Sequence, residues 1–389
     1  MSSIKWFIRI MTRKDEEVVS NVKVGYFGKV FDLRTAVYFE NFAHISAEKV
    51  KYVLIDPDLS FTRCWSASEK RSVKKFFKKT TLLDIHPELE KDMLKLKYLD
   101  AQTIETIVRK VLDFQRTIPV TSLSLRTLRT FFGLPEESVE ETELYAILAP
   151  YFTISNVGGV WYKINLELLK TAIKYKKSEE KLYAVIAISR DILDDKHAIQ
   201  KIISDYALKG IDGYAIWIVD FDEIDNASQI HEFKEFVLEL KRLGKPILNL
   251  YGGYYSLLLS KLGLFEGIVT KVCYKQRRIP CQVGGPAREN YYFPPVKNKI
   301  PLHIASYIIQ DKPDYACSCP ICKGGQIVKI QMSNEDLKKH FLYAFENEIK
   351  AVENKTLGEV LHQLLKDAEE LRLIINVEHL YKWYDSLTT

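Results

Sequence analysis

The sequence predicts an α/β protein built on a (β/α)8 barrel, and two observations lead to this fold. Short, almost wholly apolar runs recur along the chain, which is typical of strands that are buried on both faces. Helical periodicities separate these runs, and the alternation indicates βαβ units in a parallel sheet. Seven or eight such units in about 250 residues match the size of a barrel. A doubly wound sheet is the alternative, but no G-x-G-x-x-G motif follows the first strand.

The apolar runs and the periodic segments place the expected elements in order. The predicted barrel strands are 51–56, 117–121, 151–155, 183–189, 213–220, 245–251 and 267–273, with 291–293 or 302–306 as the eighth. The predicted helices are 101–114, 140–148, 165–174, 197–209, 228–243 and 255–262, followed by 335–352 and 357–372. Each assignment uses the same contrast, because a short apolar run favours a buried strand and a 3.6-residue period favours a helix.

The chain is expected to contain three regions. They are an N-terminal cap at 1–45, the barrel at 46–310 with an insertion at 66–98, and a zinc-binding helical module at 311–389. The cap is expected because the strand-like segments 6–10 and 22–30 precede the regular alternation and are broken by a charged turn and by glycines.

The insertion contains a basic run, Lys70–Lys79, in which Phe76 and Phe77 lie among six basic residues. Basic and aromatic residues together can follow a phosphate backbone and stack on a base. The interpretation we favour is a solvated amphipathic helix whose two phenylalanines pack inward.

Composition sets the class of protein. The chain has 389 residues, of which 47% are hydrophobic and 28% are charged, so it can bury a sizeable core. The net charge of +5 permits a phosphate-rich partner without requiring one. No apolar run approaches the length of a membrane helix, and the N-terminus lacks the apolar centre of a signal peptide. A cytoplasmic protein without membrane contact is expected.

The strongest local motif is Cys317-Ser-Cys319-Pro-Ile-Cys322, which is followed by two glycines. Three of the six cysteines lie within six residues, which in a cytoplasmic protein favours a metal site over a disulfide framework. Three thiolates need a fourth ligand for a closed tetrahedral site. His340 is the expected fourth ligand and His362 is its rival, so the sequence predicts a structural zinc ion. A metal-free loop is the alternative.

Polar side chains follow several of the predicted strands. In a (β/α) barrel the reacting groups lie at the carboxyl ends of the strands, where paired carboxylates can supply a nucleophile and a general acid or base. The candidates are Asp56 and Asp58 after the first strand, Asp220 and Asp222 after the fifth, Asn249 and Tyr251 after the sixth, and Tyr274, Arg277 and Arg278 after the seventh. Each Asp has an ordinary alternative role, since Asp-Pro commonly ends a strand and Asp often caps a helix.

A Gly- and Pro-rich stretch at 282–292 offers a second kind of site. The glycines Gly284 and Gly285 would let backbone N–H groups approach an anion or a planar ligand, and Arg288 adds a positive charge. A plain surface loop is the alternative.

Several of these motifs and predicted elements follow one another along the chain in an order that matches a known superfamily. Gly213-Tyr214-Ala215-Ile216 opens a strand, a Lys-Pro strand ending at Gly252-Gly253 follows, and a Leu-rich helix and a buried strand lead to an Arg-bearing loop. The C-x-C-x-x-C motif and a helix close the series. This order, over about 183–348, resembles the C-terminal half of the tRNA-guanine transglycosylase superfamily of queuine and archaeosine type. The DNA-deazaguanine branch of that superfamily is a possible nearer relative.

The resemblance implies base exchange in nucleic acid, tRNA or DNA. A carboxylate attacks C1′ of a nucleotide and expels guanine, and a 7-deazaguanine then displaces the enzyme. Asp56 fits the second, proton-managing carboxylate, and a Cys3His zinc site belongs to the same family pattern. The sequence departs from that pattern in three places, one of which is that His340 lies closer to the cysteines than the family's usual ligand. The strand 267–273 contains no carboxylate, although Glu266 precedes it, and Trp217-Ile218 replaces a Gly-Gly pair. If catalysis persists, Asp220 or Asp222 is the expected nucleophile.

The sequence is also compatible with two other functions. The first is a catalytically inactive relative that acts as a nucleic-acid- or protein-binding subunit, with a homodimer as one possible assembly. It predicts that side chains fill the pocket. The second is an unrelated barrel hydrolase that uses paired carboxylates, for which the carboxylate separation would be diagnostic.

Overall fold

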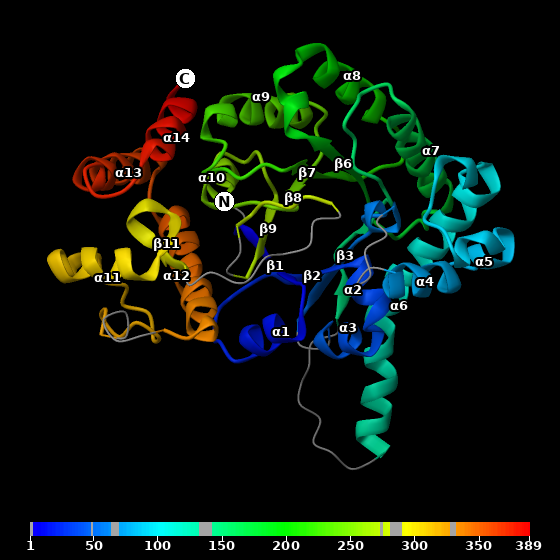
Figure 1. The fold of residues 1–389 in the computed structure, drawn as a ribbon, viewed down its shortest axis with the longest axis horizontal. Coiled ribbons are helices and arrows are strands. Elements are labelled where there is room, and N and C mark those ends of the chain that lie inside the picture. Colours follow the sequence, from blue (N-terminus) through cyan, green and yellow to red (C-terminus); the bar gives the residue numbers. More distant parts are fainter. Residues whose placement is uncertain are drawn as a thin grey trace.

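A nearly closed ring of parallel strands, with helices around it, forms the centre of the molecule (Figure 1). The computed structural model describes residues 3–47, 50–63, 70–131, 142–272, 275–280, 290–326 and 332–389. The ring contains nine segments, namely β1 (Lys5–Ile10), β2 (Gly28–Asp32), β3 (Tyr52–Asp56), β4 (Glu143–Leu144), β5 (Ile147–Leu148), β6 (Leu182–Ser189), β7 (Gly213–Val219), β8 (Ile247–Asn249) and β9 (Gly267–Lys271). Their order is β4-β3-β2-β1-β9-β8-β7-β6-β5, and every pairing in it is parallel.

The two ends of this sheet meet in one short stretch of chain. Only Tyr145 and Ala146 separate β4 from β5, and β4 pairs with β3 while β5 pairs with β6. The two segments therefore act as one interrupted strand. Counted in this way, nine segments give eight strand positions, which agrees with the predicted TIM-like barrel.

Helices connect the strands on the outside of the ring, as parallel strands require. The connecting helices are α1 (Arg13–Ser20), α2 (Leu33–Tyr38), α3 (Glu40–Ala47), α4 (Lys70–Lys79), α5 (Leu82–Ile85), α6 (Ala101–Phe131), α7 (Val160–Tyr175), α8 (Lys196–Tyr206), α9 (Ile230–Lys241) and α10 (Tyr254–Lys261). The predicted helices at 165–174, 197–209, 228–243 and 255–262 are thus confirmed to within a few residues.

The inside of the barrel is a packed core. Every second residue of a strand points inward, so one fully buried position of each strand contributes to a single apolar cluster. Its members include Phe7, Val30, Leu54, Leu148, Val185, Ala215, Leu248 and Val269. Burial of one such large side chain stabilises the fold by about 1.5–3 kcal/mol. The next inward position along several strands lies at the carboxyl end, where polar residues replace the apolar ones.

The N-terminal segments correct the expectation of a cap. β1 pairs with β9 on one side and with β2 on the other, and β2 pairs with β3. Both segments are therefore central barrel strands and do not form a hairpin, since their pairing is parallel. β1 and β2 occupy two strand positions of the barrel. The sequence had predicted 117–121 and either 291–293 or 302–306 for these positions.

Several strand or helix assignments were wrong, including the predicted strand 151–155, which carries only isolated bridges at Tyr151 and Ile154. Residues 117–121 continue α6, because Ile107, Val111 and Ile118 form a helical stripe that is buried despite the β-branched local sequence. The predicted helix 140–148 contains β4 and β5 within its described part. Residues 291–293 belong to a separate antiparallel pair, and 302–306 begin a helix.

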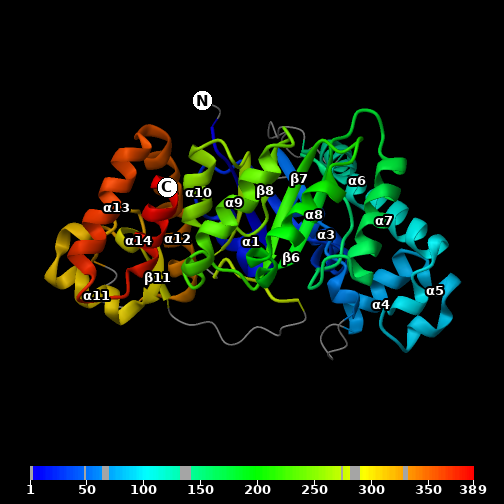
Figure 2. The same ribbon diagram turned by 90° about the horizontal axis from the view of Figure 1, so that it is seen from above.

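The insertion forms short helices between β3 and α6. On α4, Phe76 and Phe77 are 1% and 0% exposed, so the basic run is an amphipathic helix with its phenylalanines inward, as favoured from the sequence. Figure 2 shows α4 and α5 at one end of the molecule and the C-terminal helices at the other.

The C-terminal module contains the antiparallel pair β10 (Asn290–Phe293) and β11 (Asn298–Pro301) and four helices. These are α11 (Leu302–Asp311), α12 (Asn334–Asn354), α13 (Leu357–Leu371) and α14 (Glu378–Thr388). The module is tied to the barrel by side-chain contacts. Lys338 Nζ lies 2.7 Å from an Asp15 carboxylate oxygen, and Trp383 Nε1 donates to the Glu223 carbonyl at 3.0 Å.

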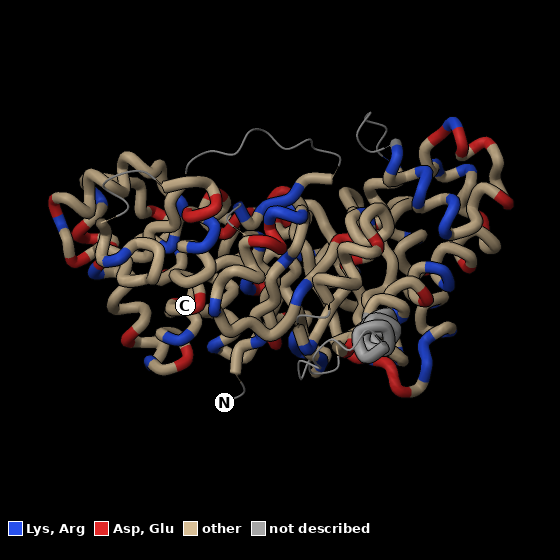
Figure 3. Tube along the Cα trace, turned by 90° about the horizontal axis from the view of Figure 1, so that it is seen from below, with Lys and Arg blue, Asp and Glu red and all other residues tan. Residues whose placement is uncertain are grey.

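Figure 3 marks Lys and Arg and also Asp and Glu along the described chain, and residues of both signs occur in the barrel and in the C-terminal module. Among the described helices, none combines the length and the apolar character that a membrane crossing requires.

Candidate functional site at the barrel mouth

The carboxyl end of the barrel holds a buried network of charged side chains. Arg9 on β1 follows the inward-pointing Phe7 by two residues, and Asp32 and Asp56 end β2 and β3 in the same way. The register pairs Asp32 directly with Asp56. The alternation of the strands therefore brings one guanidinium and two carboxyl groups to the same level of the barrel.

Arg9 connects three consecutive strands. Its Nη1 donates to Asp56 Oδ2 at 2.7 Å and to Asp32 Oδ1, and its Nη2 donates to the Leu250 carbonyl at 3.1 Å. The Arg9 and Asp56 side chains are both 0% exposed. Tyr151 donates its hydroxyl proton to Asp56 Oδ1 at 2.8 Å, so both oxygens of Asp56 are hydrogen-bonded.

A second guanidinium, from Arg278 in the loop after β9, lies above this layer. Its Nη1 is 3.5 Å from Asp32 Oδ2, and its Nη2 is 3.2 Å from Asp58 Oδ2. Nη1 also donates to the Tyr251 hydroxyl at 2.6 Å. The Arg278 side chain is 15% exposed, against 4% for Asp32 and 3% for Asp58. Arg278 is therefore the part of the network that faces solvent.

The two carboxyl groups beside Arg278 have pKa values displaced in opposite directions. Burial raises the pKa of Asp58, and the attraction of Arg278 offsets this only in part. Burial also acts to raise the pKa of Asp32, but the guanidiniums of Arg278 and Arg9 outweigh it, so the pKa of Asp32 is lowered. The two neighbouring carboxyl groups therefore differ in how readily they ionise, and Asp32 is the one whose charged form is favoured.

Aromatic rings fill the space beside the network. Trp217 on β7 is 0% exposed, and its ring centroid lies 5.2 Å from that of Tyr251 and 6.3 Å from that of Tyr151. The guanidinium carbon of Arg278 lies 5.2 Å from the Trp217 ring centroid. Within the described residues, side chains therefore occupy the centre of the mouth.

Asp220 and Arg277 form the rim. Asp220 follows β7 directly in a left-handed conformation with φ of 60°, and its side chain is 35% exposed. Its Oδ1 lies 2.6 Å from Arg277 Nε, and its backbone N–H donates to the Arg278 carbonyl. A non-glycine residue with positive φ is uncommon and often lies at a functional site.

Two other candidates have structural roles. Asp222 Oδ1 accepts the backbone N–H groups of Ile224 and Asp225, so its side chain stabilises a turn. Asn249 at the end of β8 donates to Ser256 Oγ at 2.7 Å and accepts the Tyr251 N–H, and it is 5% exposed. The candidates Tyr274, Gly284, Gly285 and Arg288 lie outside the described residues.

Sequence reasoning missed three members of the network, Arg9, Asp32 and Lys271. Lys271 ends β9 two residues after the inward-pointing Val269, and its Nζ donates to the Arg277 carbonyl at 2.6 Å. Burial, together with the positive charges of Lys299 and Arg278, lowers the pKa of Lys271 to about 7. One signal was available, since β2 ends in Phe-Asp as β3 ends in Ile-Asp. Glu266 lies at the opposite end of β9, where it binds Lys5 and Tyr183.

The second site is the predicted metal centre. The Sγ atoms of Cys317, Cys319 and Cys322 and one His340 ring nitrogen all lie within 4.8 Å of one another. The cysteines come from the loop before α12, and His340 lies on the second turn of that helix, whose start is fixed by a Ser333 capping box. The group could hold one metal ion with four protein ligands.

The surroundings of His340 orient it for this role. Its Nε2 lies 2.6 Å from the Tyr292 carbonyl, which accepts a hydrogen bond from that nitrogen and leaves Nδ1 facing the thiols. Nδ1 lies 3.2 Å from Cys322 Sγ, and the Tyr291 ring stacks on the imidazole at 4.1 Å. His340 is 0% exposed, whereas the rival ligand His362 is exposed on α13 and is not part of the group.

Comparison of the chain with models of known protein families gives no match, and no curated protein matches it significantly. The two sites are therefore interpreted from their geometry.

Proposed function

We propose that the chain is a divergent base-exchange transglycosylase that acts on nucleic acid at the barrel mouth. The observation that carries this proposal is the position of Asp32 and Asp58 on either side of Arg278, with pKa values displaced in opposite directions. Pairs of acids whose environments separate their pKa values are typical of nucleophile and acid/base roles.

The proposed steps use this pair. The ionised Asp32 attacks C1′ of the target nucleotide, the C1′–N bond to the base breaks, and Asp58 gives its proton to the leaving base. The incoming 7-deazaguanine then loses its ring N–H proton to Asp58 and displaces Asp32 from C1′. Asp56 positions Asp32 through Arg9 and is not itself free to react, since both of its oxygens are hydrogen-bonded. Arg278 must move outward for substrate to enter.

A second candidate is an inactive relative that serves as a nucleic-acid- or protein-binding subunit. The burial of Trp217 favours it, because the indole fills space that a bound base would need. Asp220, which is held by Arg277 at the rim, was the nucleophile expected from the sequence, and the steps proposed above use Asp32 in its place.

The experiment that distinguishes the transglycosylase from the inactive binding subunit measures incorporation of labelled guanine and a labelled 7-deazaguanine into tRNA and duplex DNA. We expect incorporation by the native chain that is lost in Asp32→Asn and Asp58→Asn. The matched control is Asp191→Asn, whose carboxylate is 83% exposed and should be dispensable. A native chain that binds nucleic acid but incorporates nothing would establish the binding subunit instead.

We also propose that the metal is zinc and that its role is structural. Three thiolates and one imidazole form a closed tetrahedral set with no position left for substrate. All four ligands are buried, and the second nitrogen of His340 is already engaged. The three thiols are not in disulfides, which suits a reducing compartment such as the cytoplasm.

A further inference from the structure

The loops that follow β3 and β5 meet at the rim of the barrel mouth. Asp58 pairs with Tyr151 in an isolated parallel bridge, and the Leu59 N–H donates to the Tyr151 carbonyl at 2.8 Å. The loop after β3 then forms a short 3-10 turn, Ser60–Arg63, and the loop after β5 leads into α7. Because the carboxyl ends of parallel strands lie at one end of a barrel, both segments border the face that holds the proposed reacting groups.

Arg63 and Trp161 connect these two segments. The guanidinium carbon of Arg63 lies 3.8 Å from the ring centroid of Trp161, which is on the first turn of α7, and both residues are partly exposed. At this distance a planar guanidinium stacks on the face of the indole. The stacking fixes the plane of the guanidinium and leaves the N–H groups at its edge available to a ligand.

The guanidinium of Arg63 has no partner of opposite charge at contact distance. It forms no ion pair and donates no hydrogen bond in the described part of the chain. Burial lowers the pKa of Arg63, and the attraction of Asp58 opposes that effect without reaching ion-pair distance. A partly desolvated cation without a counter-ion is stabilised by an anion that approaches it.

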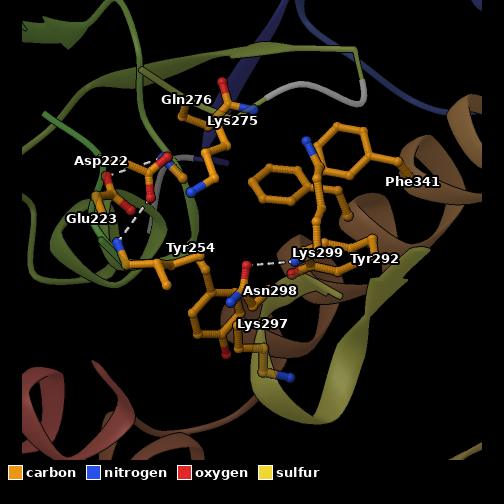
Figure 4. Close-up of a pocket in the computed structure, with 13 residues that line it drawn as sticks. Asp222, Glu223, Tyr254, Lys275, Gln276, Tyr292, Lys297, Asn298, Lys299 and Phe341 are labelled. Carbon is orange, nitrogen blue, oxygen red and sulfur yellow. Dashed lines mark hydrogen bonds between the residues drawn. The ribbon is translucent and has the colours of Figure 1, made fainter. Parts of the chain in front are cut away.

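Other cations on this face are already bound to carboxylates. They are Arg277 with Asp220, Lys275 with Asp225, and Arg278 with Asp32 and Asp58. The cleft beside Lys275, between the barrel loops and the metal module, encloses only about 50 Å³, which is far less than a nucleotide requires (Figure 4). Arg63 differs from these groups because its charge is available at an open rim.

Buried contacts hold the Trp161 ring in place. Phe152 packs against the ring with a centroid distance of 4.8 Å, and Phe152 itself is 0% exposed. Asn165, also on α7, accepts the Phe152 N–H at 2.8 Å and donates to the Phe152 carbonyl at 2.7 Å. The surface on which Arg63 stacks is therefore formed before any ligand arrives, and a preformed site loses little conformational entropy on binding.

We propose that Arg63, stacked on Trp161, binds a backbone phosphate of the nucleic acid whose target nucleotide enters the barrel mouth. This inference rests on the proposed function for the identity of the partner. The guanidinium fork matches two phosphate oxygens, and contacts of this kind fix the register of a strand without reading its sequence. Asp58, the proposed acid, lies five residues before Arg63 in the same loop. Arg63 is thus a positioning residue that holds the strand next to the reacting carboxyl groups.

The test measures the affinity of the full chain for labelled tRNA and for labelled duplex DNA over a range of salt concentrations. Each phosphate contact contributes about 0.9 to the slope of log K against log salt for duplex DNA. We expect Arg63→Gln to reduce this slope by about 0.9 and to weaken binding about 10-fold at low salt. Arg63→Lys keeps the charge and should keep the slope. Neither variant removes a hydrogen bond or an ion pair, so both should fold like the native chain, which a thermal unfolding curve checks.

Arg242→Gln is the matched control. It removes the same charge from a side chain that is 70% exposed. Arg242 follows α9 and precedes β8, so it lies toward the amino ends of the strands, away from the mouth. We expect this variant to bind both nucleic acids with the affinity and the salt slope of the native chain.

The outcomes separate the phosphate contact from the catalytic proposal. A lower slope in Arg63→Gln, without any base exchange by the native chain, supports the phosphate contact and removes the transglycosylase. Base exchange by the native chain, with unchanged affinity and slope in Arg63→Gln, overturns the phosphate contact alone. Failure of the native chain to bind either nucleic acid also overturns it, and so does an equal loss in Arg242→Gln, which would show only a general effect of charge.

Discussion

Arg9 and Asp56 meet at 2.7 Å in the barrel mouth although 47 residues separate them, and neither side chain is exposed. The two residues lie on β1 and β3, with β2 between them, so this contact spans three strands. A buried ion pair of this kind is weak evidence for stability by itself, because desolvation of both charges opposes the attraction. Removal of one partner is expected to destabilise the fold strongly, because the other charge is then left buried without a counter-charge.

We expect Arg9→Met to lower the free energy of unfolding by about 3–5 kcal/mol, because Asp32 and Asp56 then lose a fully buried counter-charge. Arg242→Met is the control, since Arg242 is 70% exposed and pairs with Glu239 three residues away. That change should cost less than about 1 kcal/mol. Chemical denaturation measures both, and equal effects would show that the network does not depend on Arg9.

The buried amine of Lys271 should make stability depend on pH in the alkaline range. Its pKa is about 7 in the folded chain and near the ordinary 10.5 in the unfolded chain. Between these values the unfolded chain binds more protons, so the free energy of unfolding rises with pH. We expect the native chain to gain on the order of 4 kcal/mol relative to Lys271→Met from pH 7 to pH 10. Parallel pH profiles for the two chains would contradict the burial of a neutral amine.

Metal removal should destabilise the C-terminal module. We expect one zinc ion per native chain by elemental analysis, and loss of that ion together with a lower Tm in Cys319→Ser and His340→Gln. Ser318→Ala, at an exposed position inside the same motif, should retain the metal and the native Tm. Metal-free native chain with an unchanged Tm in all three variants would rule out a structural ion.

The sequence predicted the second half of the barrel and the Cys3His group, and it failed where charges are buried. β6 and β7 are apolar on both faces, so their patterns identify them directly. β1 and β2 instead carry Arg9 and Lys29, which looked like surface residues. Both are 0% exposed, because Arg9 binds Asp32 and Lys29 Nζ binds Glu16 at 2.8 Å.

Such pairs are formed by residues distant in sequence, so no local pattern reveals them. The Cys3His group was predictable for the opposite reason. Three of its ligands lie within one short motif, and a helix cap fixes the position of the fourth. Asp32 was missed because the predicted segment 22–30 was assigned to a cap and ends before it, although its place at a strand end is the same as that of Asp56.

Trp217 offers a direct test of whether the barrel mouth can hold a base-sized ring once the indole is removed. It is fully buried between Tyr151 and Tyr251, and its indole N–H has no hydrogen-bond partner among the described residues. Trp217→Ala should therefore lower the free energy of unfolding by about 3–5 kcal/mol, mainly through the cavity it leaves.

A flat apolar cavity of this kind binds aromatic molecules of matching size. We expect indole and benzimidazole to raise the Tm of Trp217→Ala in a concentration-dependent way and to leave the native chain unchanged. Leu250→Ala, at a fully buried aliphatic position next to Tyr251, is the control and should not respond to either compound. A Tm that neither compound raises would mean that the surrounding side chains collapse into the space, and a base would then find no room there.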